Sequence, residues 1–127
     1  MNPDILKNFL IVGAGGALGS IMRYSMSLIF MRLGVTQFPA ATLAVNATGS
    51  LVIGFLAVAL KDAHEVWRLL LIVGIIGGYT TFSAFSNETL TLFNNDRVLQ
   101  AMLNVFLNVT VCLFCVYAGF KLAKAVI

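Results

Sequence analysis

Charged residues are scarce in this sequence. Only 10% of its 127 residues are Asp, Glu, Lys or Arg, whereas 60% are hydrophobic, and the mean hydropathy is +0.97. Soluble domains have about a quarter of their residues charged, so the composition excludes an ordinary soluble domain and predicts an integral membrane protein. The net charge of +3 comes from eight basic and five acidic residues scattered along the chain, which is too little for a nucleic-acid surface.

Cysteine and histidine are also rare, with two and one residues respectively. Cys112 and Cys115 lie in an apolar stretch without a second cysteine pair or a nearby histidine, so neither a zinc site nor a disulfide framework is predicted. The single His64 lies in a short charged loop. We therefore expect that the chain is not an enzyme, while an accessory membrane subunit without transport activity stays open as an alternative.

Four apolar stretches dominate the chain, and each is long enough to cross a hydrocarbon core, which takes about 20 helical residues. The first is too long for the core of a cleaved signal peptide, so we expect it to be retained as a span. The connections are too short for a soluble domain. The predicted fold is a single all-α domain of four transmembrane helices, approximately Ile5 to Met31, Ala40 to Leu60, Val66 to Phe93 and Val98 to Ala123.

Basic residues differ little between the two sides of such a protein. The side with both chain ends has Lys7, Lys61, Arg68, Lys121 and Lys124, and the other has Arg23, Arg32 and Arg97. An excess of five against three is too small to select one orientation by the positive-inside rule. Insertion in both orientations is therefore permitted, and a single orientation with both ends in the cytoplasm is equally open.

The third span is expected to be interrupted. Its 28 residues would form a straight helix of about 42 Å, longer than the membrane requires. Gly77, Gly78, Thr80 and Thr81 lie at its centre and weaken the helix. Interrupted backbone at this depth must be satisfied by protein, an ion or a wet cavity, and its carbonyls could bind a small cation. An intact helix with a hydroxyl-rich packing face is the alternative.

Two other spans have polar side chains at intervals of four, which places each set on one helix face. The second span has Thr42, Asn46 and Ser50, and the fourth has Asn104, Asn108 and Cys112. Such residues usually face the helix bundle or a water path, and amides and hydroxyls can donate hydrogen bonds to an anion. Ordinary hydrogen bonds between helices are the alternative role.

Aromatic and charged residues near these stripes suggest the same kind of ligand. Phe82 and Phe85 share a helix face, and the positive edges of their rings can attract an anion, although packing is their usual role. Arg23 is the one deep basic residue, unless its side chain extends to the headgroups. Glu88 is the lone acid well inside a span, where a hydroxyl or Arg23 could be its partner.

Small residues predict close helix packing. Gly15 and Gly19 form a GxxxG pair in the first span, and Gly74 and Gly78 form another in the third. Four helices enclose too little space for an aqueous path, so we expect the chain to assemble with other subunits.

The segment from Gly77 to Ser86, followed by Glu88, closely resembles the signature of the CrcB/Fluc family of fluoride channels. The resemblance extends to 19–24, 42–46 and 104–119. It implies an antiparallel, dual-topology homodimer in the lipid of a bacterial inner membrane, with two fluoride pathways and a structural sodium ion. The sequence departs from the family pattern at Ala84, Cys112 and Val116.

The resemblance also implies roles for single residues. Backbone carbonyls of Gly77 and Thr80 would hold the sodium ion. Asn46 would donate to fluoride beside the rings of Phe82 and Phe85, and Arg23 would raise the local anion concentration at the vestibule. The other residues expected along the pathway are Thr42, Ser83, Ser86, Asn108 and Cys112.

A small dual-topology multidrug exporter is the second candidate. Such exporters exchange protons for a cationic drug at a carboxylate in the first span. Here that span has no acid after Asp4, which favours the channel.

Overall fold

The computed structural model of the chain describes residues 3–127, and all of its regular structure within that range is helical. The first span is helix α1 (Pro3–Arg32) and the second is α2 (Ala40–Ala59). The fourth is α6 (Val98–Val126), which ends three residues beyond the expected Ala123. With the third span, these helices are long and apolar enough to cross a membrane, so the prediction of an all-α protein with four spans is confirmed.

The third span is divided into four consecutive elements. It begins with α3 (Glu65–Trp67), widens into the π-helical segment η1 (Arg68–Ile76), and returns to α-helix in α4 (Gly77–Tyr79). Two extended residues follow, Thr80 with ψ 156° and Thr81 with φ −153°. Helix then resumes in α5 (Phe82–Asn94). The expected interruption therefore lies at the two threonines, whereas Gly77 and Gly78 remain helical.

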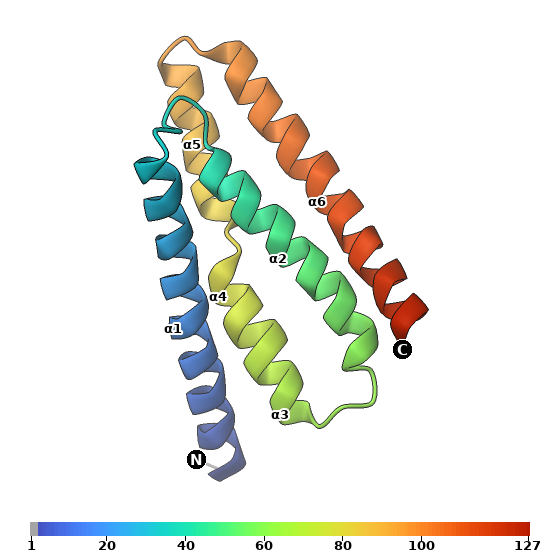
Figure 1. Cartoon of the computed structure of the whole chain (residues 1–127). Helices are drawn as coiled ribbons and strands as arrows, with labels where there is room; N and C mark the ends of the chain where they lie inside the picture. The colour runs from blue at the N-terminus through green and yellow to red at the C-terminus, as the bar shows by residue number, and fades with distance from the viewer. Residues whose placement is uncertain (1–2) are drawn as a thin grey trace.

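The interruption lets the two halves of the third span pack against different neighbours. The first half, η1 and α4, lies along α1, whereas α5 packs against α6, and α2 also runs along α6. Figure 1 shows this arrangement, with α1 beside the half of the third span that ends in α4 on one side and α2 beside α6 on the other. The turns that follow α1 and α5 lie close together at one end of the bundle.

Glycines allow the first and third spans to approach each other closely. A Cβ atom on Gly15 would lie 2.9 Å from the Cα of Gly74, and one on Gly78 would lie 2.9 Å from the Cα of Gly16. The glycines of both GxxxG pairs thus pack against each other's helices within one chain. The predicted close helix packing is therefore confirmed, and the expected assembly with other subunits stays a prediction.

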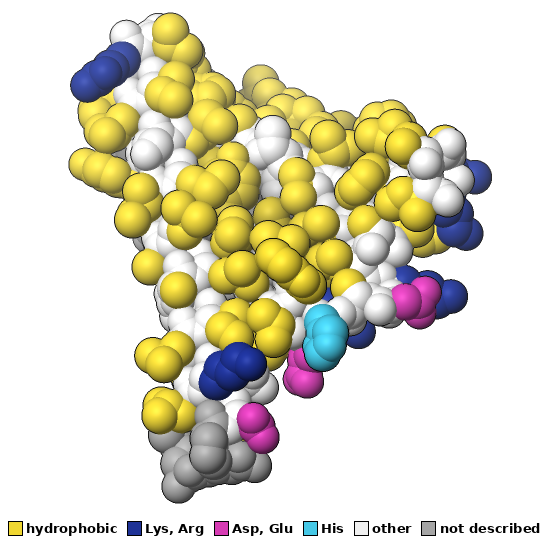
Figure 2. Space-filling model, turned by 60° about the horizontal axis from the view of Figure 1, so that its bottom comes forward, with side chains coloured by type: hydrophobic (Ala, Val, Ile, Leu, Met, Phe, Trp, Pro, Cys, Tyr) yellow, Lys and Arg dark blue, Asp and Glu magenta, His cyan; other side chains and the backbone are white. Residues whose placement is uncertain are grey.

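The described chain has a small core and a largely apolar surface. Its buried hydrophobic residues are Val45, Ile76, Tyr79, Phe85, Leu92, Ala101 and Ala123. Most large apolar side chains of α1 and α6 are instead exposed. Figure 2 shows hydrophobic side chains over most of the visible face and the charged ones toward its margins. This distribution is that of a membrane protein, whose outer surface contacts lipid or other subunits.

Candidate functional site

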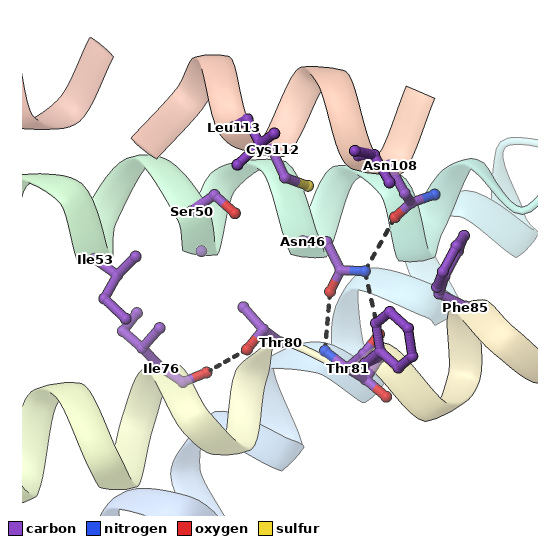
Figure 3. Close-up of a pocket in the computed structure, with 13 residues that line it drawn as sticks. Asn46, Ser50, Ile53, Ile76, Thr80, Thr81, Phe85, Asn108, Cys112 and Leu113 are labelled. Atoms are coloured by element: carbon purple, nitrogen blue, oxygen red, sulfur yellow. Dashed lines mark hydrogen bonds between the residues drawn. The ribbon is translucent and has the colours of Figure 1, made fainter. Parts of the chain in front are cut away.

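A cavity of about 460 Å³ lies beside the interruption of the third span. We call it the main cavity (Figure 3). Residues from α2, the interrupted segment and α6 line it, and none of them is acidic or basic. Its polar and aromatic lining residues are Asn46, Ser50, Thr80, Thr81, Phe82, Phe85, Asn108 and Cys112. Five of the expected pathway residues, Asn46, Phe82, Phe85, Asn108 and Cys112, therefore face one space.

Asn46 bonds to both backbone groups of Thr81. The Thr81 N–H donates to Asn46 Oδ1 at 2.9 Å, and Asn46 Nδ2 donates to the Thr81 carbonyl at 3.1 Å. The extended conformation of Thr81 removes these groups from the helical hydrogen-bond ladder, so they need partners where water is scarce. The side-chain amide of Asn46, on α2, supplies both partners, so both backbone groups of Thr81 are hydrogen-bonded.

The pairing with Asn46 affects the carbonyl of Gly77. In a continuous helix the Thr81 N–H would bond to this carbonyl, four residues earlier, but here it bonds to Asn46 instead. Gly77 is exposed on the single chain, and Thr80 is extended and half-buried. A backbone oxygen released from the helix at an exposed position is a suitable ligand for a hard cation. No group of three or more His, Cys, Asp or Glu residues that could hold a metal occurs in residues 3–127.

A series of amide hydrogen bonds extends from Asn46 across the bundle. Asn46 Nδ2 donates to Asn108 Oδ1 at 3.1 Å, and Asn108 Nδ2 donates to Asn104 Oδ1 at 2.9 Å. Asn104 Nδ2 donates to Thr89 Oγ1 at 2.9 Å, and this hydroxyl donates to the Phe85 carbonyl at 2.8 Å. The Asn46 amide thus has two acceptors, so it can donate to an anion only by exchanging one of them. Its expected bond to fluoride stays a prediction.

The two phenylalanines lie side by side but differ in burial. Their ring centroids are 5.3 Å apart, and the ring planes are inclined at 60°. Phe85 is 7% exposed, whereas Phe82 is 78% exposed in the single chain. A tilted pair of this kind is a favoured aromatic arrangement. The exposure of Phe82 leaves one side of the main cavity bordered by a ring that has few contacts within its own chain.

Ser83 and Ser86 are exposed and are not among the lining residues of the main cavity. The Ser83 hydroxyl is 3.2 Å from that of Thr81, and the Ser86 hydroxyl donates to the carbonyl of Phe82 at 2.9 Å. Thr81 also caps α5, because its Oγ1 accepts from the Ala84 N–H at 3.1 Å. The hydroxyls of Ser83 and Ser86 thus lie at the start of α5, outside the lining of the main cavity.

Arg23, Thr42 and Glu88 line a second cavity of about 280 Å³, which Thr81 also lines. The Thr42 hydroxyl donates to Glu88 Oε1 at 2.6 Å. Of the two partners expected for Glu88, the structure thus places the hydroxyl in contact. Glu88 Oε2 is buried without a hydrogen-bond partner in the described range. Arg23 is half-buried, so the one deep cation and the one deep acid face the same space.

Sequence reasoning did not identify the roles of Thr89 and Asn104. Asn104 is 0% exposed, and Thr89 is 9% exposed. The interval of four from Phe85 to Thr89 suggests a hydroxyl bond to the preceding helical turn, but the partner on α6 depends on how the helices pack. Asn104 belonged to the expected polar stripe, yet spacing alone could not distinguish a residue lining the cavity from a buried support.

Residues 10–120 match the family model described as CrcB-like protein, Camphor Resistance (CrcB). The chain is 51% identical over 124 residues to the Fluoride-specific ion channel FluC of Elusimicrobium minutum, covering 97% of this chain and 98% of that protein. It is 43% identical to the protein of the same name from Shewanella amazonensis, covering 92% and 96% of the two chains. It is 39% identical to that of Rhizobium meliloti, covering 96% and 100%.

Proposed function

Because this chain belongs to the CrcB family of membrane proteins, we propose that it is a fluoride-selective channel that lets fluoride leave the cell. The observation that carries this proposal is the main cavity, where an interrupted span meets amide, hydroxyl and aromatic side chains without a charged group. The relatives named fluoride-specific channels support it along nearly the whole chain.

The physical task of such a channel is to replace the water shell of a small, strongly hydrated anion without binding it too tightly. Neutral donors and ring edges suit this task because they attract the anion without a full opposing charge. We assign the contact with fluoride to Asn46, Asn108, Phe82 and Phe85, with Cys112 farther along the same cavity. The ion would take the place of one acceptor now bonded to the Asn46 amide.

The second cavity would be the vestibule. Arg23 lies there beside Thr42 and Glu88, and a cation at that position attracts anions from the aqueous side. The Thr42 hydroxyl bonds to Glu88 Oε1, which keeps part of the carboxylate occupied. Ser83 and Ser86 would be available to the ion only from the exposed side of α5.

The working unit would be an antiparallel homodimer in a bacterial inner membrane, with two pathways. Support for assembly comes from the exposed ring of Phe82, which borders the main cavity without being covered by its own chain. Support for mixed orientation comes from the distribution of basic residues, five on one side and three on the other.

A structural sodium ion would bind between the subunits, held by the carbonyls of Gly77 and Thr80. The donor set fits this ion, since the Gly77 carbonyl has lost its helical donor to Asn46 and hard cations prefer oxygen ligands. The test is to exchange sodium for a bulky organic cation during purification. The dimer should then dissociate at a lower denaturant concentration; unchanged stability would remove the ion from the account.

The function is tested with purified protein in liposomes loaded with fluoride or chloride. A potassium ionophore balances the charge, so that only conductive movement of the anion is scored. We expect rapid fluoride release and no chloride release above that of empty vesicles. Equal release of both anions would refute selectivity. No release of either anion, together with uptake of a cationic substrate driven by a proton gradient, would instead identify the multidrug exporter.

A further inference from the structure

Asn104 is the most deeply buried polar side chain of the described range, with 0% exposure. Burying an amide in an apolar environment is costly unless it is hydrogen-bonded. Its Nδ2 donates to Thr89, and its Oδ1 accepts from Asn108. The bond to Thr89 is the one side-chain hydrogen bond between α6 and α5 within residues 3–127, so it links the two elements specifically.

The hydroxyl of Thr89 transmits this link to Phe85. It accepts from Asn104 at 2.9 Å and donates to the Phe85 carbonyl at 2.8 Å. Since the hydroxyl has a single hydrogen, the bond from Asn104 leaves that hydrogen free for the carbonyl of the preceding turn. The position of the Phe85 backbone is thereby tied to α6 through two hydrogen bonds.

The first turn of α5 is consequently held at both ends. Asn46 bonds to the backbone of Thr81 before this turn, and Asn104 acts through Thr89 at Phe85. Asn108 joins the two amides. The phenylalanine rings that border the main cavity both project from this turn, which follows an interruption and so lacks support from a continuous helix.

We propose that Asn104 is a positioning residue for Phe85, acting through the Thr89 hydroxyl and not through contact with the ion. Asn104 is absent from the lining of the main cavity, which agrees with an indirect role. This inference rests on the proposed fluoride function, because the rings matter only if the anion passes them. The bond orients the turn so that Phe85 faces the cavity at the separation from Phe82 seen here.

The test compares Thr89→Val with Thr89→Ser. Valine keeps the shape and removes the hydroxyl, whereas serine keeps the hydroxyl and loses a methyl group. If Thr89 acted through packing, fluoride flux should be higher in Thr89→Val, which keeps the shape. If Thr89 acts through its hydroxyl, flux should be higher in Thr89→Ser. We expect fluoride flux in liposomes to fall about fivefold or more in Thr89→Val, since one hydrogen bond contributes roughly 1 kcal/mol. Thr89→Ser should retain flux close to that of the native chain.

Thr91→Val is the matched control, because the exposed Thr91 hydroxyl bonds only within its own helix, to the Asn87 carbonyl. Asn104→Leu should lower flux as Thr89→Val does, and the double variant should lose no more than the stronger single variant. Hydrogen exchange of the segment 81–90 provides a readout independent of transport, and it should be faster in Thr89→Val than in Thr89→Ser.

The outcomes separate this inference from the function itself. If the native chain passes no fluoride, the proposed function fails, and hydrogen exchange alone judges the link from Asn104 to Phe85. If the native chain conducts and Thr89→Val equals Thr91→Val in flux and exchange, Asn104 is no positioning residue. Additive losses in the double variant would also overturn the proposal, because they would mean that the two residues act separately.

Discussion

Asn46 has two tasks at the interruption of the third span. Its amide satisfies the N–H and the carbonyl of Thr81, and in the proposed channel it also meets the anion. The spacing of Thr42, Asn46 and Ser50 predicted a polar face on α2. It could not predict that Asn46 pairs with backbone, because that depends on Thr81 being extended and lying opposite.

Replacing Asn46 by leucine should destabilise the subunit. The change keeps a similar volume and leaves two backbone groups of Thr81 without partners, which costs roughly 2 to 4 kcal/mol. Denaturant unfolding in detergent measures the loss. Ser50→Ala, one turn later on α2 and in the same cavity, serves as the control and should change stability by less than about 1 kcal/mol. Equal losses in both variants would mean that Asn46 does not stabilise the interruption.

Replacing Phe82 and replacing Phe85 by isoleucine should affect stability differently but fluoride transport alike. Phe85→Ile removes contacts of a buried ring and should cost about 1 to 3 kcal/mol of subunit stability, whereas the exposed Phe82 should tolerate isoleucine. Both changes should reduce fluoride flux by about tenfold, equivalent to ~1.4 kcal/mol, while the dimer persists on size exclusion. Native flux in both variants would exclude the rings from the pathway.

Helix packing explains what the glycine pairs do. Gly15 faces η1 so closely that a Cβ would lie 2.7 Å from the Leu70 carbonyl oxygen, whereas nothing lies within 4 Å of a Cβ on Gly13. The same substitution should therefore have opposite effects at the two positions. Gly15→Ala should destabilise the subunit by about 1 to 3 kcal/mol. Gly13→Ala should stabilise it slightly, because alanine favours helix by up to about 1 kcal/mol. Thermal unfolding in detergent distinguishes them, and equal effects would disprove this packing.

The elements show which features a sequence pattern can predict. The four apolar stretches were sufficient to predict the four spans, because the thickness of the membrane sets the length of a spanning helix. The expected interruption of the third span lies at the β-branched Thr80 and Thr81, whereas Gly77 and Gly78 remain helical although glycine disfavours helix. The π-helical segment Arg68–Ile76 and the exchange of packing partners at Thr80 were not predicted. Segment η1 packs against α1, and α5 packs against α6; local propensity does not encode such contacts between helices.

The molecule as a whole raises the question of orientation. The expected mixture rests on an excess of only five basic residues against three, so modest changes should abolish it. A short run of lysines added after Ile127 should place every chain with its ends in the cytoplasm. The combined variant Asn94→Lys, Asn95→Lys, Lys7→Gln, Lys61→Gln, Lys121→Gln and Lys124→Gln leaves one basic residue on the side with the chain ends against five on the other, and it should invert the chain.

Each biased variant alone should form few antiparallel dimers and should give cells little protection from fluoride. Expressed together, the two variants should restore protection, because each supplies the orientation that the other lacks. Labelling of single cysteines placed in the loops reports the orientation directly. Full protection by one biased variant alone would show that a parallel arrangement is sufficient.

The central claim is that fluoride itself moves conductively past an interrupted span lined with uncharged donors. The most direct test is the reversal potential of the purified protein in a planar bilayer, with equal pH and equal chloride on both sides and a tenfold fluoride gradient. The account predicts a reversal potential close to the ideal value of about 59 mV, unchanged when chloride is then made unequal. A potential near zero, or one that follows the chloride gradient, would contradict it.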